Sequence, residues 1–145
     1  MEEIIKEGKE LMANLQATTI SGSLIHKEGT ATLSGTSITI DLTTGRSFEV
    51  DLQGASGNIA TFNITGAFVA GTSCGDFLLN VTQGSTARNI LWGSLTGVNP
   101  RWAGDGGSAG SGPTITTTND KKDIFYFSTW NAGTTWYARI IGQNF

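Results

Sequence analysis

Apolar and polar residues alternate along the segment 37–53, which is the clearest pattern in the chain. Two apolar series carry it: Ile38, Ile40 and Leu42, then Phe48, Val50 and Leu52. A period of two is typical of β-strands with one buried face. Residues opposite one another in a hairpin point to the same side of the sheet, so a three-residue loop at 44–46 fits the pattern. It sets Leu42 against Phe48, and we expect an antiparallel hairpin here.

Further short segments have the composition or alternation of strands. They are 59–65, 77–82, 89–95, 114–118, 124–130 and 135–141, and glycine-rich turn sequences separate them. No second helical pattern is long enough for the crossover that parallel strands usually need. The sequence therefore predicts a single all-β domain over 16–145, built as an antiparallel sandwich or a jelly-roll-like fold.

The first fifteen residues follow a different period. The apolar residues of this segment, Ile4, Ile5, Leu11, Met12 and Leu15, recur at helical spacing beside a charged face. A helix this short is marginal alone and needs a partner surface. The range 1–15 is either a helix folded onto its own domain, a leader that precedes Met12, or an anchor. An anchor docks on another protein or bundles with copies of itself.

A long glycine-rich stretch, 97–113, interrupts the rhythm of strands, and loops of this length are often functional. It carries Arg101, Trp102 and Asp105, an aromatic ring beside polar groups that suits contact with a sugar. In the competing interpretation Trp102 folds back under the loop or enters a subunit contact. Trp130 and Asn131, at a predicted hairpin tip, are second candidates for ligand binding.

The penultimate strand has apolar residues on both faces, in the sequence Ile-Phe-Tyr-Phe at 124–127. Such a strand must be covered on both sides, by two layers of its own fold or by another chain. The last strand also alternates, so the end of the chain is predicted to be structural. We expect a subunit interface here, with these residues as candidates: Phe125, Phe127, Trp136 and Ile141.

Composition narrows the function further. The net charge is −3, the isoelectric point is about 5.0, and charged residues make up 14% of the chain, so no basic field for nucleic acid is present. No apolar run reaches the roughly 18 residues that span a bilayer. With one cysteine, the chain forms no internal disulfide.

Candidate chemistry is sparse. The predicted hairpin register sets Asp41 opposite Glu49, a weak candidate for a divalent-metal or acid–base pair; the simpler interpretation is a solvated strand face. The one histidine, His26, cannot form a histidine cluster, and no Gly-x-Ser-x-Gly or phosphate-loop motif occurs. We therefore expect that the protein is not an enzyme and that it binds no cofactor.

Several longer stretches resemble a family of phage structural proteins labelled tail fibres or tail-fibre tips, especially of cyanophages and other marine phages. The stretches are "ITIDLTTGRSFEVDLQGASGNIATFNI", "FLLNVTQGSTARNILWGSL" and "GSGPTITTTNDKKDIFYFSTWNAGTTWYARIIGQNF". The resemblance covers about residues 30 to 145 and is most specific in the last third. This chain departs from the family in "RWAGDGGSAGSG", where members commonly carry a compact Trp-Pro-Gly-Gly.

The resemblance implies a trimeric, β-structured virion protein on a tail fibre or the capsid surface, with other virion proteins as partners. The leading expectation is a fibre tip that binds a host-surface receptor, most simply a glycan. The alternative is a capsid decoration or tail adaptor subunit with a purely structural role. An enzyme that degrades host polysaccharide comes third, because strand carboxylates are scarce.

Overall fold

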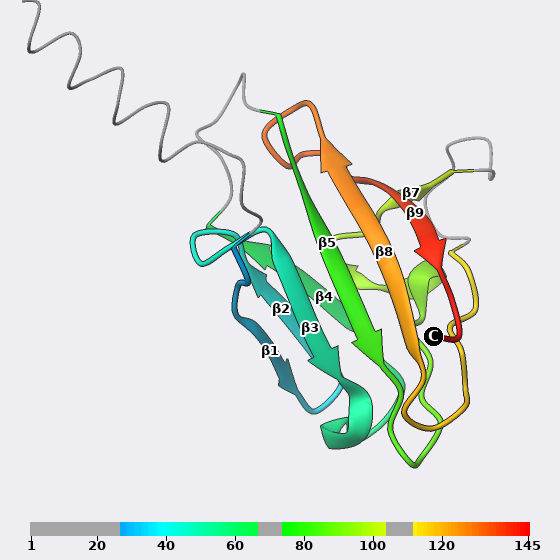
Figure 1. The fold of residues 1–145 in the computed structure, drawn as a ribbon. Coiled ribbons are helices and arrows are strands. Elements are labelled where there is room, and N and C mark those ends of the chain that lie inside the picture. Colours follow the sequence, from blue (N-terminus) through cyan, green and yellow to red (C-terminus); the bar gives the residue numbers. More distant parts are fainter. Residues whose placement is uncertain (1–26, 67–73, 104–111) are drawn as a thin grey trace, which may run out of the picture.

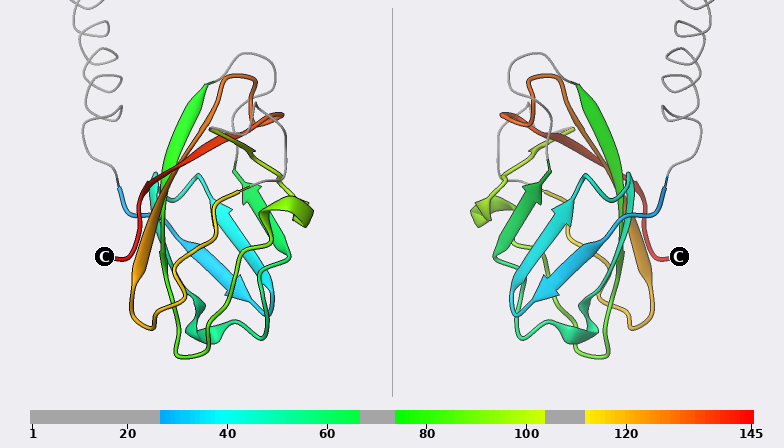
Figure 2. Two further views of the ribbon diagram at one scale, coloured as in Figure 1. Left: turned by 90° about the vertical axis from the view of Figure 1, so that its right-hand side faces the viewer. Right: turned by 90° about the vertical axis from the view of Figure 1, so that its left-hand side faces the viewer.

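The computed structural model describes residues 27–66, 74–103 and 112–145, which form two β-sheets facing each other across a common core (Figures 1 and 2). The four-stranded sheet consists, in order, of β1 (Ala31–Ser34), β2 (Ser37–Asp41), β4 (Thr61–Thr65) and β6 (Thr96–Gly97). The five-stranded sheet consists of β3 (Ser47–Asp51), β5 (Gly75–Thr82), β8 (Lys122–Thr129), β9 (Tyr137–Gly142) and β7 (Arg101–Trp102). The predicted all-β class is confirmed, whereas the predicted helix at 1–15 lies outside the described residues.

Both sheets are mixed, so the prediction of an antiparallel fold is wrong. Strand β2 is parallel to β4, and β3 is parallel to β5. The chain passes from β2 in one sheet to β3 in the other, returns as β4, and crosses again to β5. Each of these two parallel pairs is therefore connected through a strand of the opposite sheet. The prediction assumed that only a helix could make such a crossover.

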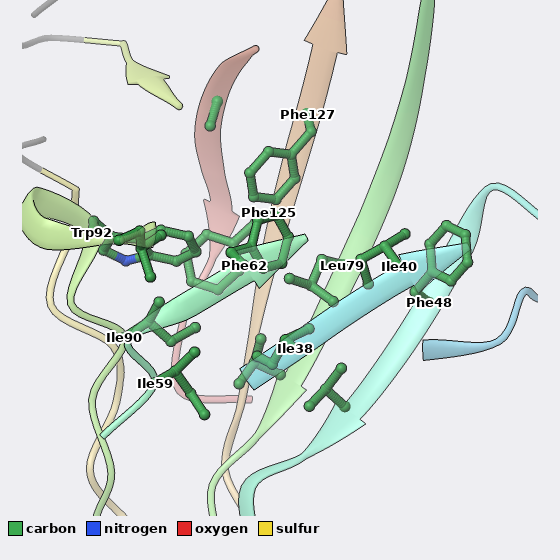
Figure 3. Packing of buried hydrophobic residues seen from close by; sticks show 14 of the residues in the cluster. Ile38, Ile40, Phe48, Ile59, Phe62, Leu79, Ile90, Trp92, Phe125 and Phe127 are labelled. Atoms are coloured by element: carbon green, nitrogen blue, oxygen red, sulfur yellow. The ribbon is translucent and has the colours of Figure 1, made fainter. Parts of the chain in front are cut away.

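The hairpin predicted over 38–52 is also wrong, although both of its strands exist. Strand β2 pairs with β1 and β4, while β3 pairs with β5. Ile40 and Phe48 both point into the core, from opposite sheets (Figure 3). Alternation shows which face of a strand is buried but not which strand lies beside it, so the same pattern fits a hairpin and a crossover between sheets.

A hydrogen-bonded corner carries the chain from β2 to β3. One carboxylate oxygen of Asp41 accepts hydrogen bonds from the backbone N–H of Thr43 at 3.0 Å and from its hydroxyl at 2.6 Å. These bonds, the side-chain one foremost, lower the pKa of Asp41 below its ordinary value. The hydroxyl of Thr44 donates to the backbone oxygen of Asp41 at 2.7 Å and accepts from the backbone N–H of Thr30 at 2.7 Å.

The proposed carboxylate pair is wrong for the same reason. Asp41 belongs to the four-stranded sheet, and Glu49 belongs to the five-stranded sheet. Glu49 instead accepts from the ammonium of Lys122 at 2.6 Å and from the hydroxyl of Thr82 at 3.2 Å. The bond from Lys122 lowers the pKa of Glu49. In 27–66, 74–103 and 112–145, no group of three or more histidine, cysteine, aspartate or glutamate side chains could hold a metal ion.

Aromatic rings fill the core between the sheets (Figure 3). The rings of Phe77 and Phe127 stack with centroids 4.7 Å apart, and Phe62 of the opposite sheet stacks on Phe127 at 5.6 Å. Phe125, Phe127 and Trp136 are all fully or almost fully buried within one chain. Their assignment to a subunit interface is therefore a mistake: the fold itself covers the inner face of β8. Ile141 differs, with 53% of its surface exposed.

Two predicted strands are absent from the described sheets. In the range 89–95 the chain forms a single bridge between Ile90 and Ile59 and then the 3-10 helix η2 (Trp92–Ser94). The range 114–118 is extended but unpaired. Side chains, not a neighbouring strand, hold the backbone of Thr116 by hydrogen bonds. The composition of this range therefore predicted a strand that does not form.

A buried polar cluster holds this segment and ties down the end of the chain. The amide of Gln83 donates to the backbone oxygens of Arg88 and Thr116, each at 2.8 Å. The carboxylate of Asp123 accepts from the backbone N–H of Thr116 at 2.6 Å and from that of Asn144 at 3.1 Å. The motifs TQGST, TITTT and GQNF therefore meet at the beginning of β8, where they order the last residues of the chain.

Candidate functional site

Outward-facing side chains at the far end of β8, beyond the buried polar cluster, surround a shallow pocket of about 300 Å³. It is lined by Ala103, Tyr126, Ser128, Trp130, Tyr137, Ala138 and Arg139. These residues belong to β8 and β9 or directly follow β7 and β8, and the three strands lie together at this edge of the five-stranded sheet (Figure 1). Since the pairing register sets Tyr126 beside Arg139 and Ser128 beside Tyr137, alternate residues of both strands face the same side.

Two exposed aromatic rings dominate the pocket. Trp130 is 67% exposed and Tyr137 is 41% exposed, and their ring centroids lie 5.4 Å apart with the planes inclined at 61°. Aromatic side chains of this size are normally kept in a core or at an interface, because they carry a large apolar surface. The pair therefore presents an apolar platform to solvent at the edge of a concave surface.

The turn between β8 and β9 fixes the position of Trp130. The hydroxyl of buried Thr129 accepts from the backbone N–H of Gly133 at 3.1 Å. The side-chain oxygen of Asn131 accepts from the backbone N–H of Thr135 at 2.9 Å, and its amide donates to the Thr135 hydroxyl at 3.2 Å. Asn131 was predicted to bind a ligand, but its side chain is engaged in shaping this turn.

Polar groups flank the aromatic platform. The hydroxyl of Tyr126 donates to a carboxylate oxygen of Asp76 at 3.1 Å, and the guanidinium of Arg139 lies 5.0 Å from the centre of the Tyr126 ring. Partial burial of the phenol and then the bond to Asp76 raise the pKa of Tyr126 above its ordinary value. The cation–π contact holds Arg139 against the sheet.

A second hollow, of about 340 Å³, adjoins the first on the side of β5. Tyr126, Ser128 and Trp130 line both hollows, while Asp76 and exposed Cys74 line the second alone. The two hollows form one continuous surface that crosses β8, and we call it the aromatic pocket.

The fold places some of the predicted ligand-binding residues at the aromatic pocket and others elsewhere. Trp130 lines the aromatic pocket, as proposed for the hairpin tip. Arg101 is exposed and paired with Tyr137 in register, two residues before pocket-lining Ala103, so it faces the same side. Trp102 is 3% exposed and packs on Trp92 at 4.7 Å in the core, so its role as a ligand contact is wrong. Asp105 lies outside the described residues.

Sequence reasoning missed Asp76, Tyr126, Tyr137 and Arg139. Three of these could have been found from the alternation of side chains along a strand. Tyr126 and Trp130 are an even number of residues apart and so share a face, as do Tyr137 and Arg139 in the next strand. A hairpin at 130–135 places both sets on one face. Asp76 could not have been placed, because its position depends on the pairing of β5 with β8.

No known family model, curated protein or solved structure matches this chain. In the part of the chain that is described, no helix is long and apolar enough to cross a membrane.

Proposed function

We propose that this protein is a phage virion protein of the tail-fibre-tip type that binds a host-surface glycan through the aromatic pocket. The observation that carries the proposal is the exposed pair of Trp130 and Tyr137 at two adjoining hollows, of which Arg139 lines the first, Asp76 the second and Tyr126 both. The motifs that resemble phage tail-fibre proteins support the virion assignment independently.

The chemistry of the pocket suits a sugar better than a purely apolar ligand. A pyranose ring has one face of C–H groups, which can lie on an aromatic ring, and a rim of hydroxyls, which need donors and acceptors. Trp130 and Tyr137 offer the aromatic surface, Asp76 offers an acceptor and Arg139 offers donors. Because the pocket is shallow and open to solvent, it fits one segment of a longer chain.

The structural alternative, a capsid decoration or tail adaptor subunit, has its own supporting observation. Ile141 and Phe145 are 53% and 62% exposed near the end of the chain. Exposed apolar side chains close together in sequence are typical of contacts between subunits. The homotrimer suggested by the family resemblance is part of both proposals, and Ile141 stays a candidate for its interface. In either case residues 1–15 are proposed as the attachment segment to the virion.

A glycan array probed with the purified protein and with Trp130→Ala tests the proposed function. We expect retention of at least one bacterial-surface glycan by the unmodified chain and loss of that binding in the variant. Thr117→Ala is the control, because Thr117 is exposed and lies outside both hollows. Absence of glycan binding, together with assembly of the subunit into particles, would favour the structural alternative.

A further inference from the structure

The two sides of the aromatic pocket carry opposite charges. On the side of β7 and β9, Arg139 lines the pocket and Arg101 faces the same way beside Tyr137. Among the described residues the one ion pair is that between Lys122 and Glu49, so neither guanidinium is paired with a carboxylate there. Within the described residues, two guanidinium groups without a carboxylate partner therefore lie beside the exposed aromatic pair.

The side of β5 carries the opposite charge. Asp76 lines the second hollow and already accepts one hydrogen bond, from Tyr126. A carboxylate has about four lone-pair sites, so Asp76 can accept further bonds from hydroxyl groups. It also repels an anionic group.

Size limits what each hollow can take. Their volumes, about 300 Å³ and 340 Å³, are at the low end of the range of roughly 300–1,000 Å³ for ligand sites. Each hollow therefore accommodates a group of about one sugar residue. Trp130 lines both, so two adjacent sugars of one chain can lie on its ring or its edges at the same time.

We infer that the aromatic pocket recognises an acidic glycan, with an anionic sugar beside Arg139 and Arg101 and a neutral sugar beside Asp76. This inference rests on the proposed function and names the class of glycan. A planar guanidinium binds a carboxylate with two parallel hydrogen bonds, and it also binds a sulfate group. The charge difference across Trp130 fixes the direction in which the saccharide lies.

The test uses pairs of oligosaccharides that contain uronic or sialic acid, each with its carboxyl-reduced counterpart and a sulfated form of that counterpart. Affinities are measured by titration calorimetry. We expect the carboxylated member of at least one pair to bind about tenfold or more tightly than the reduced one. In Arg139→Gln this preference should fall to about twofold or less, whereas Lys121→Gln, a control outside the pocket, should keep it. If the sulfated form binds as tightly as the carboxylated one, the pocket recognises the negative charge alone. If it binds more weakly, the pocket recognises the carboxylate itself.

The outcomes separate this inference from the proposed function. If reduced and acidic members bind equally and Trp130→Ala removes both, the pocket binds glycans and the acidic preference is overturned. If no member binds, the acidic preference is overturned, and the glycan array decides the proposed function separately. A melting temperature of Arg139→Gln equal to that of the unmodified protein shows that the exposed substitution left the fold intact. Modification of Cys74 by a maleimide gives a second readout, because an occupied second hollow should slow the reaction.

Discussion

At the scale of single residues, the buried carboxylate of Asp123 is held by an unusually large number of hydrogen bonds. It is 2% exposed and accepts from the backbone N–H and the hydroxyl of Thr116, from the backbone of Asn144, and more weakly from Gln143 at 3.4 Å. These donors come from two segments that no strand pairing holds. The side chain of Asp123 thus provides hydrogen bonds that a neighbouring strand would otherwise provide. The alternation of apolar and polar residues gives no sign of such bonds.

Replacing Asp123 by Ala leaves the backbone N–H groups of Thr116 and Asn144, which are partly buried in these bonds, without their acceptor. We expect a loss of about 3 kcal/mol in the free energy of unfolding, which corresponds to a fall of roughly 10 °C in melting temperature. Differential scanning calorimetry measures it, with Glu28→Ala as a control because Glu28 is an exposed carboxylate. A change of less than about 1 kcal/mol would show that the end of the chain is held by other contacts.

At the scale of elements, the sequence predicted which segments are strands better than it predicted their partners. The ranges around β2, β3, β4, β5, β8 and β9 were all expected, because each buries one face and so alternates. The crossings between sheets were missed, since alternation is the same for a hairpin and for two strands on opposite sides of a core. The two-residue strands β6 and β7 are too short to leave any periodic pattern.

Strand β6 lies against β4 only because Gly97 has no side chain. Its φ of 89° lies in the left-handed region, and a Cβ placed there would be 2.5 Å from the backbone oxygen of Phe62. We therefore expect Gly97→Ala to destabilise the fold by about 2 kcal/mol or more, as measured by urea unfolding. Gly54→Ala is the matched control, since its Cβ would meet only Leu33 at 3.6 Å. Equal effects of the two substitutions would contradict this account of the close approach.

At the scale of the whole molecule, the fold buries residues of both the predicted ligand site and the predicted interface. Trp102 and Phe127, singled out for a ligand and for a subunit contact, both lie in the core of one chain. Trp130 and Ile141 remain at the surface. Sequence alone could rank these residues as large and apolar, but only the packing of one sheet on the other decides which of them solvent or another molecule can reach.

Exposed Ile141 and Phe145, not the buried residues of β8, are the candidate contacts between subunits of the proposed trimer. Sedimentation velocity should give a single species with three times the mass of the chain. The double substitution of both residues by Asp should shift it to the monomer, because it places charges in an apolar contact. Its far-ultraviolet circular dichroism should stay that of a β-protein. An unmodified chain that sediments as a monomer would contradict the proposed trimer.

The central claim, that the aromatic pocket holds a glycan, is tested most directly through the indole N–H signals of the chain's four tryptophans in ¹H–¹⁵N spectra. Trp92, Trp102 and Trp136 are buried and serve as internal references, while Trp130 is exposed in the pocket. Titration with a glycan retained on the array should shift the Trp130 signal, assigned by its loss in Trp130→Phe, and leave the signals of the three references nearly unchanged. A bound glycan that leaves the Trp130 signal in place would contradict the assignment of the site.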